Sequence, residues 1–144
     1  MKLEGNIEFL NYIYQNAEMG KTTISQLIDI AEDQSFKQCL QSQFREYNQI
    51  FDMADNKIKQ FQEKSKGLGT MTKLKTYIMI NINTIKDKTA SHIAEMMIQG
   101  SSMGIVDITK KLKEYNNAEK DIIELGNSLM KFEQQNIEEM KTFL

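Results

Sequence analysis

The chain lacks proline and is poor in glycine, cysteine and histidine. Its 144 residues include no Pro, seven Gly, one Cys and one His. Because proline breaks helices and glycine destabilises them, little in this composition interrupts a helix. The single cysteine, Cys39, excludes an intrachain disulfide and every metal motif that needs several cysteines. We interpret it as a small buried thiol.

The charge balance and the lack of a long apolar run exclude further classes. The 18 Lys and Arg residues are balanced by 20 Asp and Glu residues, for a net charge of −2, so the basic excess that binds nucleic acid is missing. The longest apolar stretch, Tyr77 to Ile82, is far shorter than the roughly 18 residues of a membrane span. Glu4 and Glu8 interrupt the first apolar residues, unlike a signal peptide. We expect a cytoplasmic protein that binds neither nucleic acid nor membrane.

Four long stretches carry apolar residues at steps of three and four, which predicts four amphipathic helices. The predicted helices cover residues 6–32, 36–66, 89–115 and 118–144. Ser35 and Thr89 are the predicted N-caps of the second and third helices. The residues that we expect in the core include Leu27, Phe44, Tyr47, Met97, Leu129 and Ile137.

The segment 70–88 has an ambiguous pattern. Residues 78–83 alternate as in a strand, but a single strand would have no partner in this chain. The apolar residues also fit a helix, and a helix of about 17 residues spans about 25 Å. We therefore predict a helical crossover that makes the second and third long helices parallel. The result is one domain, residues 1–144, with two antiparallel hairpins.

This plan resembles the ferritin-like bundles. The run from Ser91 to Gly104, SHIAEMMIQGSSMG, is also similar to a segment of uncharacterised ferritin-like proteins of low-GC bacteria. The resemblance covers nearly the whole chain at the level of pattern, and it implies an all-α, ferritin-like fold of four long helices. Catalytic members of that superfamily bind two metal ions through a Glu on two helices and a Glu-x-x-His on the other two.

The family pattern selects candidate metal ligands in this sequence. Four acidic residues and the single histidine are the candidates: Glu18, Glu46, His92, Glu95 and Glu133. Gln49 and Asn136 stand where the family has histidines, and amides are poor ligands for a redox metal. We therefore predict no cofactor, with iron or manganese as the alternative. Glu133 lies among the apolar residues of its helix, so we expect it to point inward.

Glycines in the middle of the predicted helices remove side-chain volume. Those that we single out are Gly20, Gly100, Gly104 and Gly126. Each costs up to about 1 kcal/mol relative to Ala in a helix, so some other feature should offset that cost. They either allow close packing against a large aromatic neighbour or line a small cavity that admits a ligand.

The sequence leaves three functional hypotheses open. The first is a non-catalytic or degenerate ferritin-like bundle with an interaction or scaffold role, for which a homodimer through helix faces is one partner state. The second is a carboxylate-rich, metal-binding oxidoreductase or metal storage protein. The third is a small-molecule binder that uses a glycine-lined cavity in the middle of the bundle.

Overall fold

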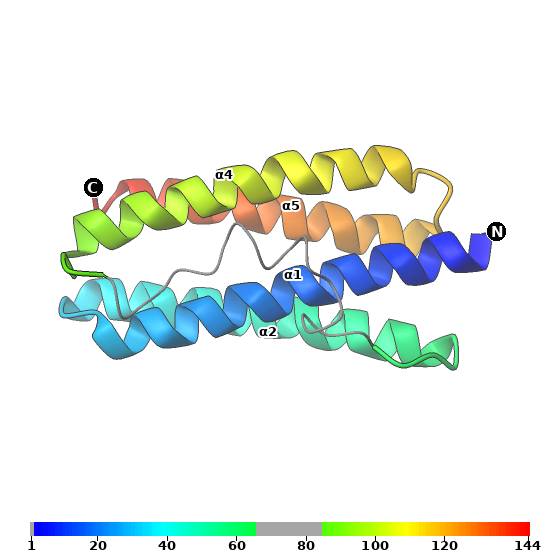
Figure 1. Ribbon diagram of the computed structural model, residues 1–144, viewed down its shortest axis with the longest axis horizontal. Helices are drawn as coiled ribbons and strands as arrows, with labels where there is room; N and C mark the ends of the chain where they lie inside the picture. Colours follow the sequence, from blue (N-terminus) through cyan, green and yellow to red (C-terminus); the bar gives the residue numbers. More distant parts are fainter. Residues whose placement is uncertain (1, 66–84) are drawn as a thin grey trace.

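The computed structural model of the chain describes residues 2–65 and 85–144. Four long α-helices fill these ranges (Figure 1): α1 (Lys2–Ile30), α2 (Gln34–Gln60), α4 (Ala90–Glu114) and α5 (Lys120–Lys141). The described residues contain no strand, which confirms the predicted all-α class. None of the described helices is both long and apolar enough to cross a membrane.

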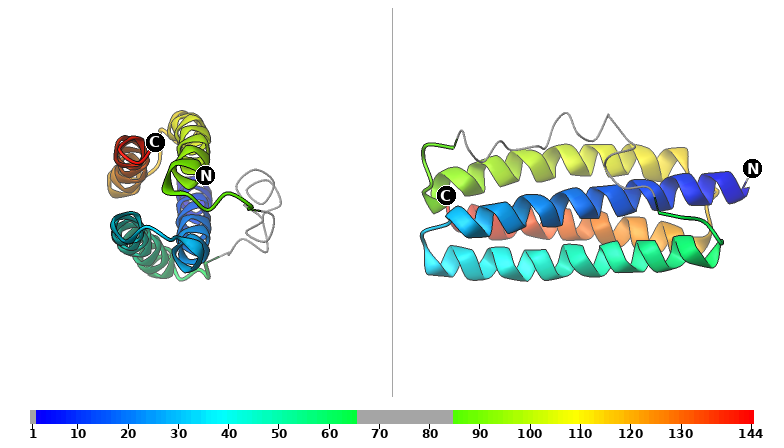
Figure 2. Two further views of the ribbon diagram at one scale, coloured as in Figure 1. Left: turned by 90° about the vertical axis from the view of Figure 1, so that its left-hand side faces the viewer. Right: turned by 60° about the horizontal axis from the view of Figure 1, so that its bottom comes forward.

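The helices pack as two antiparallel hairpins. α1 and α2 form the first hairpin, and α4 and α5 form the second (Figure 1). α2 and α4 start at the same end of the bundle and run in the same direction, as predicted. Seen end-on in Figure 2, α1 lies next to α4 and α2 lies next to α5. All four helices therefore contribute side chains to one common core.

Side-chain caps set where α2 and α4 begin. The Asp33 carboxylate accepts a hydrogen bond from the backbone N–H of Phe36 at 3.0 Å. Asp33 is therefore the N-cap of α2, and the prediction of Ser35 was wrong because an aspartate two residues earlier caps the helix first. The Thr89 hydroxyl accepts from the N–H of His92 at 3.3 Å, which confirms the predicted N-cap of α4.

The chain between the two hairpins differs from the prediction where it is described. α2 ends at Gln60, before the predicted end near residue 66. Gln62 has a φ of 61°, a left-handed conformation that does not continue a right-handed helix. Most of the predicted crossover helix, residues 70–84, lies outside the described residues. Its last part was wrong, because residues 85–88 are not helical.

The core follows the predicted apolar stripes. The largest fully buried side chains come from all four helices: Phe9, Leu10, Ile13, Met19, Leu27, Phe36, Leu40, Ile58, Ile93, Ile108, Ile122 and Leu129. Among the predicted core residues, three are buried: Leu27, Tyr47 and Leu129. The other three are half-buried: Phe44, Met97 and Ile137. Residues at the edge of an apolar stripe face both the core and the solvent, because the stripe covers only part of a helix surface.

Two glycines allow aromatic rings to pack directly against a helix backbone. A Cβ atom on Gly20 would lie 2.5 Å from the ring of Tyr47, and one on Gly126 would lie 2.6 Å from the ring of Phe9. Both distances are shorter than van der Waals contact, so each ring occupies the space that a side chain would need. The close-packing interpretation is therefore confirmed for these two glycines.

Polar contacts fasten the two hairpins together near the start of α5. The Asn6 side-chain oxygen on α1 accepts a hydrogen bond from the backbone N–H of Glu119 at 2.9 Å. Lys57 on α2 forms an ion pair with Asp121 on α5. The first contact satisfies a helix N-terminal N–H group that has no intrahelical partner. These contacts fix α5 against both helices of the first hairpin.

Candidate functional site

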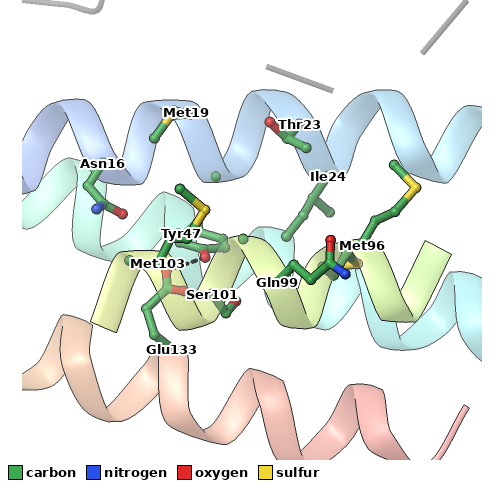
Figure 3. Close-up of a pocket in the computed structure, with 14 residues that line it drawn as sticks. Asn16, Met19, Thr23, Ile24, Tyr47, Met96, Gln99, Ser101, Met103 and Glu133 are labelled. Atoms are coloured by element: carbon green, nitrogen blue, oxygen red, sulfur yellow. Dashed lines mark hydrogen bonds between the residues drawn. The ribbon is translucent and has the colours of Figure 1, made fainter. Parts of the chain in front are cut away.

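A cavity lies in the middle of the bundle, between α1 and α4. Its volume is about 240 Å³, and α2 and α5 contribute one side chain each, Tyr47 and Glu133 (Figure 3). The rest of the lining comes from α1 and α4: Asn16, Met19, Gly20, Thr23, Ile24, Met96, Met97, Gln99, Gly100, Ser101, Met103 and Gly104. Ligand sites in helical bundles are built in this way, from side chains on facing helices.

Two glycines of α4 leave the cavity open. Among residues 2–65 and 85–144, a Cβ atom on Gly100 would meet no heavy atom within 4 Å, so no described group fills the space that the missing side chain leaves. A Cβ atom on Gly104 would lie 3.5 Å from Oε2 of Glu133, an ordinary contact distance. Gly100 and Gly104 therefore line a cavity, as one of the two interpretations predicts. Gly20 also lines it, but the space of its missing side chain is occupied by the Tyr47 ring.

Glu133 supplies a buried carboxyl group to the cavity. It is 4% exposed, and its carboxylate accepts hydrogen bonds from the hydroxyl groups of Tyr47 and Ser101. Burial raises the pKa of Glu133 from 4.5 to about 7, although the two hydrogen bonds act in the opposite direction. No lysine, arginine or histidine among the described residues forms an ion pair with it.

Tyr47 is a fixed hydrogen-bond donor to this carboxylate. Its ring packs on Gly20 and makes an edge contact with Phe132, with centroids 4.6 Å apart. Burial, and then the charge of Glu133, hold the pKa of Tyr47 well above its usual value of 10. Asn136, one turn after Glu133 on α5, also hydrogen-bonds the hydroxyl. Tyr47 therefore keeps its proton at physiological pH.

A second set of hydrogen bonds joins α1 to α4 beside the cavity. The Asn16 side-chain N–H donates to the Tyr12 hydroxyl at 3.4 Å, and that hydroxyl donates to Oδ2 of Asp107 at 2.7 Å. Asn16 and Tyr12 are buried, and Asp107 is half-buried. These bonds orient the Asn16 amide, whose nitrogen is engaged with Tyr12, at the wall of the cavity (Figure 3).

One of the five predicted metal-ligand candidates lines the cavity, and it is Glu133. Two others are exposed, Glu46 and Glu95, and two are half-buried outside the cavity lining, Glu18 and His92. In residues 2–65 and 85–144, no group of three or more His, Cys, Asp or Glu side chains is arranged to hold a metal ion. A dinuclear centre of the ferritin type requires about four carboxylates. The cavity residues therefore do not fit such a centre.

The direction of each residue around its helix explains this arrangement. Successive residues of an α-helix point about 100° apart. On α2 the inward position is taken by Tyr47, so Glu46 faces the solvent. On α4 the buried residue is Ala94, and Glu95 is exposed. The expectation that Glu133 points inward is confirmed.

The polar partners of Glu133 were not predicted from the sequence. Tyr47 was expected in the core, but not as a hydrogen-bond donor, and Ser101 was not selected. One signal was available, because a buried tyrosine hydroxyl and a buried carboxylate both need partners. Two such groups on inward positions at a similar height in a bundle are candidates for each other.

Comparison of the chain with models of protein families, with curated protein sequences and with solved structures found no match. The structure itself establishes a four-helix, all-α bundle with two hairpins. A function for this chain is therefore inferred from the cavity and the residues that line it.

Proposed function

We propose that this protein is a non-catalytic bundle that binds a small molecule in the cavity between α1 and α4. The observation that carries this proposal is the open space beside Gly100, in a helix whose glycines are otherwise unfavourable. Apolar cavities of about 150 Å³ bind a benzene ring, and the cavity here is about 240 Å³. Its apolar walls and few polar groups are typical of a ligand pocket.

We also propose that the bundle has a ferritin-like plan whose metal chemistry is reduced or lost. Two antiparallel hairpins with parallel α2 and α4 support this plan, as does the resemblance of the run from Ser91 to Gly104. Glu133 is the single carboxylate among the described residues that line the cavity, which supports the loss of the metal centre. A metal-binding oxidoreductase or storage protein is the weaker hypothesis, since such proteins concentrate several carboxylates at one level.

An interaction or scaffold role is the second candidate function. The observation that favours it is the exposure of two apolar side chains on α4, Met103 at 44% and Val106 at 57%. Exposed apolar side chains that lie together mark interaction surfaces more often than scattered ones do. A protein partner or a second copy of the chain would cover this part of α4.

Calorimetric titration with two probes of the same shape tests the cavity proposal. The probes are cyclohexylmethanol and cyclohexylmethylamine, and we expect at least one to bind saturably at one site. Gly100→Leu would fill the cavity and abolish binding. Ser102→Leu places the same side chain at an exposed position of α4 outside the lining and should leave binding intact. Failure of both probes to bind, or binding unchanged in Gly100→Leu, would contradict the proposal.

A further inference from the structure

We propose that the ligand of this cavity is a small organic cation, an apolar body with one protonated amine that pairs with the Glu133 carboxylate. This inference rests on the proposed function, because it requires that the cavity binds a small molecule. It goes further by assigning the chemical class of the ligand and the residue that recognises it.

Glu133 has no countercharge among the described residues. A charged side chain that is almost fully buried is normally paired with an opposite charge. Among the described residues, the carboxylate contacts the neutral hydroxyls of Tyr47 and Ser101 and forms no ion pair. A cation bound in the cavity would supply the charge that the neighbouring side chains do not.

One carboxylate oxygen of Glu133 lies beside Gly104 of the cavity lining. Oε1 of Glu133 accepts the hydrogen bond from Tyr47, while Oε2 faces the place that a Gly104 side chain would occupy, at 3.5 Å from the position of its Cβ. The absence of that side chain leaves Oε2 within reach of a group in the cavity. An ammonium group has three donors and no acceptor, so it matches an acceptor of this kind. The Asn16 amide, whose nitrogen is engaged with Tyr12, also lines the cavity, from α1.

The charge and polarity of the other lining residues limit which ligands the cavity can accept. The described residues that line the cavity include no lysine, arginine or histidine, so among them a ligand with a carboxylate or phosphate group would meet Glu133 without any compensating charge. Apolar contacts come from Met19, Ile24, Met96 and Met97. Methionine side chains adapt to the shape of an apolar partner. The cavity therefore matches an apolar body with a cationic end.

The protonation of Glu133 makes amine binding dependent on pH. The titratable group packed against Glu133 is Tyr47 of α2, and the lining residues of α1 and α4 carry no titratable side chain. The pKa of Tyr47 is well above 10 and that of Glu133 is about 7. The charged fraction of Glu133 therefore rises about tenfold between pH 6 and pH 8, while an aliphatic amine stays protonated. The affinity for the amine should rise by a similar factor.

The experiment compares the two isosteric probes by calorimetry at pH 6 and pH 8. In the unmodified protein we expect cyclohexylmethylamine to bind at least about tenfold more tightly than cyclohexylmethanol at pH 8, and this preference should shrink at pH 6. Glu133→Gln should abolish the preference, because the amide side chain carries no charge to pair with the ammonium group. Glu46→Gln removes an exposed carboxylate on α2 and should preserve the preference.

The possible results distinguish a failure of the amine inference from a failure of the proposed function. If the alcohol binds as well as the amine and Gly100→Leu abolishes both, the cavity proposal stands and the amine inference is overturned. Amine binding that ignores pH also overturns it, and this measurement needs no variant that might fail to fold. A preference for the amine over the alcohol that persists in Glu133→Gln also overturns the amine inference. If neither probe binds, both proposals fail.

Discussion

The Tyr47 hydroxyl on α2 donates a hydrogen bond to the Glu133 carboxylate on α5, and both side chains are buried in the middle of the bundle. This contact links the two hairpins at the level of the cavity. It orients the carboxylate without neutralising it, because a tyrosine hydroxyl is a neutral donor. Stability, pH dependence and ligand binding should therefore all be sensitive to this pair.

The free energy of unfolding should fall as the pH rises through the range in which Glu133 titrates. The pKa of Glu133 is about 7 in the folded protein and 4.5 for an ordinary glutamate. Between these values the folded state holds the proton more tightly, so stability is lost with increasing pH, by about 3 kcal/mol above pH 7 relative to pH 4.5. Urea unfolding from pH 4.5 to pH 8 should show this loss, and Glu133→Gln should remove it. If the free energy of unfolding changes with pH in the same way in the unmodified protein and in Glu133→Gln, the raised pKa of Glu133 is contradicted.

Tyr47→Phe should destabilise the protein by about 1–3 kcal/mol, because it removes one of the donors to a buried carboxylate. The aromatic ring remains, so its packing against Gly20 and Phe132 is kept. Urea unfolding at pH 8 measures the effect, which should be smaller at pH 5, where the carboxyl group is neutral. A loss of equal size at both pH values would point to packing instead.

Alanine substitutions at two glycines should have opposite effects. Gly20→Ala places a Cβ atom 2.5 Å from the Tyr47 ring, and such overpacking costs about 1–3 kcal/mol. The Cβ atom of Gly100→Ala meets no atom of the described residues within 4 Å, so this variant should gain up to about 1 kcal/mol from helix propensity. The two variants differ by the same methyl group, so thermal or urea unfolding compares them directly. Equal destabilisation would mean that the space beside Gly100 is filled.

Leu129→Ala should cost about 2–5 kcal/mol of unfolding free energy, because Leu129 is fully buried on α5 and its removal leaves a cavity. Half-buried Ile137, on the same helix, offers the comparison, since Ile137→Ala should cost less. A loss below about 1 kcal/mol at Leu129 would show that the packing of α5 differs from the structure.

The protein should bind no stoichiometric iron tightly and should not accelerate the oxidation of ferrous iron by oxygen. Gln49 and Asn136 stand where the ferritin-like pattern, which this sequence resembles, has histidines, and oxygen ligands without imidazole favour weak, exchangeable binding of harder ions. Metal analysis of untagged protein, purified without chelators, measures the iron content. Stoichiometric iron that is lost in Glu133→Ala, with the helical fold retained, would favour the metal-binding hypothesis.

Much of the fold follows from local features of the sequence. The spacing of apolar residues predicts the helices, since a helix brings positions three and four apart to one face. Thr89 caps α4 because a side-chain oxygen accepts from an N–H group only a few residues away. The prediction of a helix failed at residues 85–88. The spacing of apolar residues there fits a helix, but the structure has no helix at these positions.

By itself, the sequence determined the helical class, the four long helices, and the inward direction of Glu133, because each depends on neighbours within a turn or two of one helix. The tertiary structure decided which side chains from different helices contact one another. The rotation of α2 places Tyr47 rather than Glu46 beside Glu133. The distances between helices decide that Gly20 is filled by a ring while Gly100 borders open space. The four glycines look alike in the sequence, since the volume opposite each one belongs to a helix that is distant along the chain.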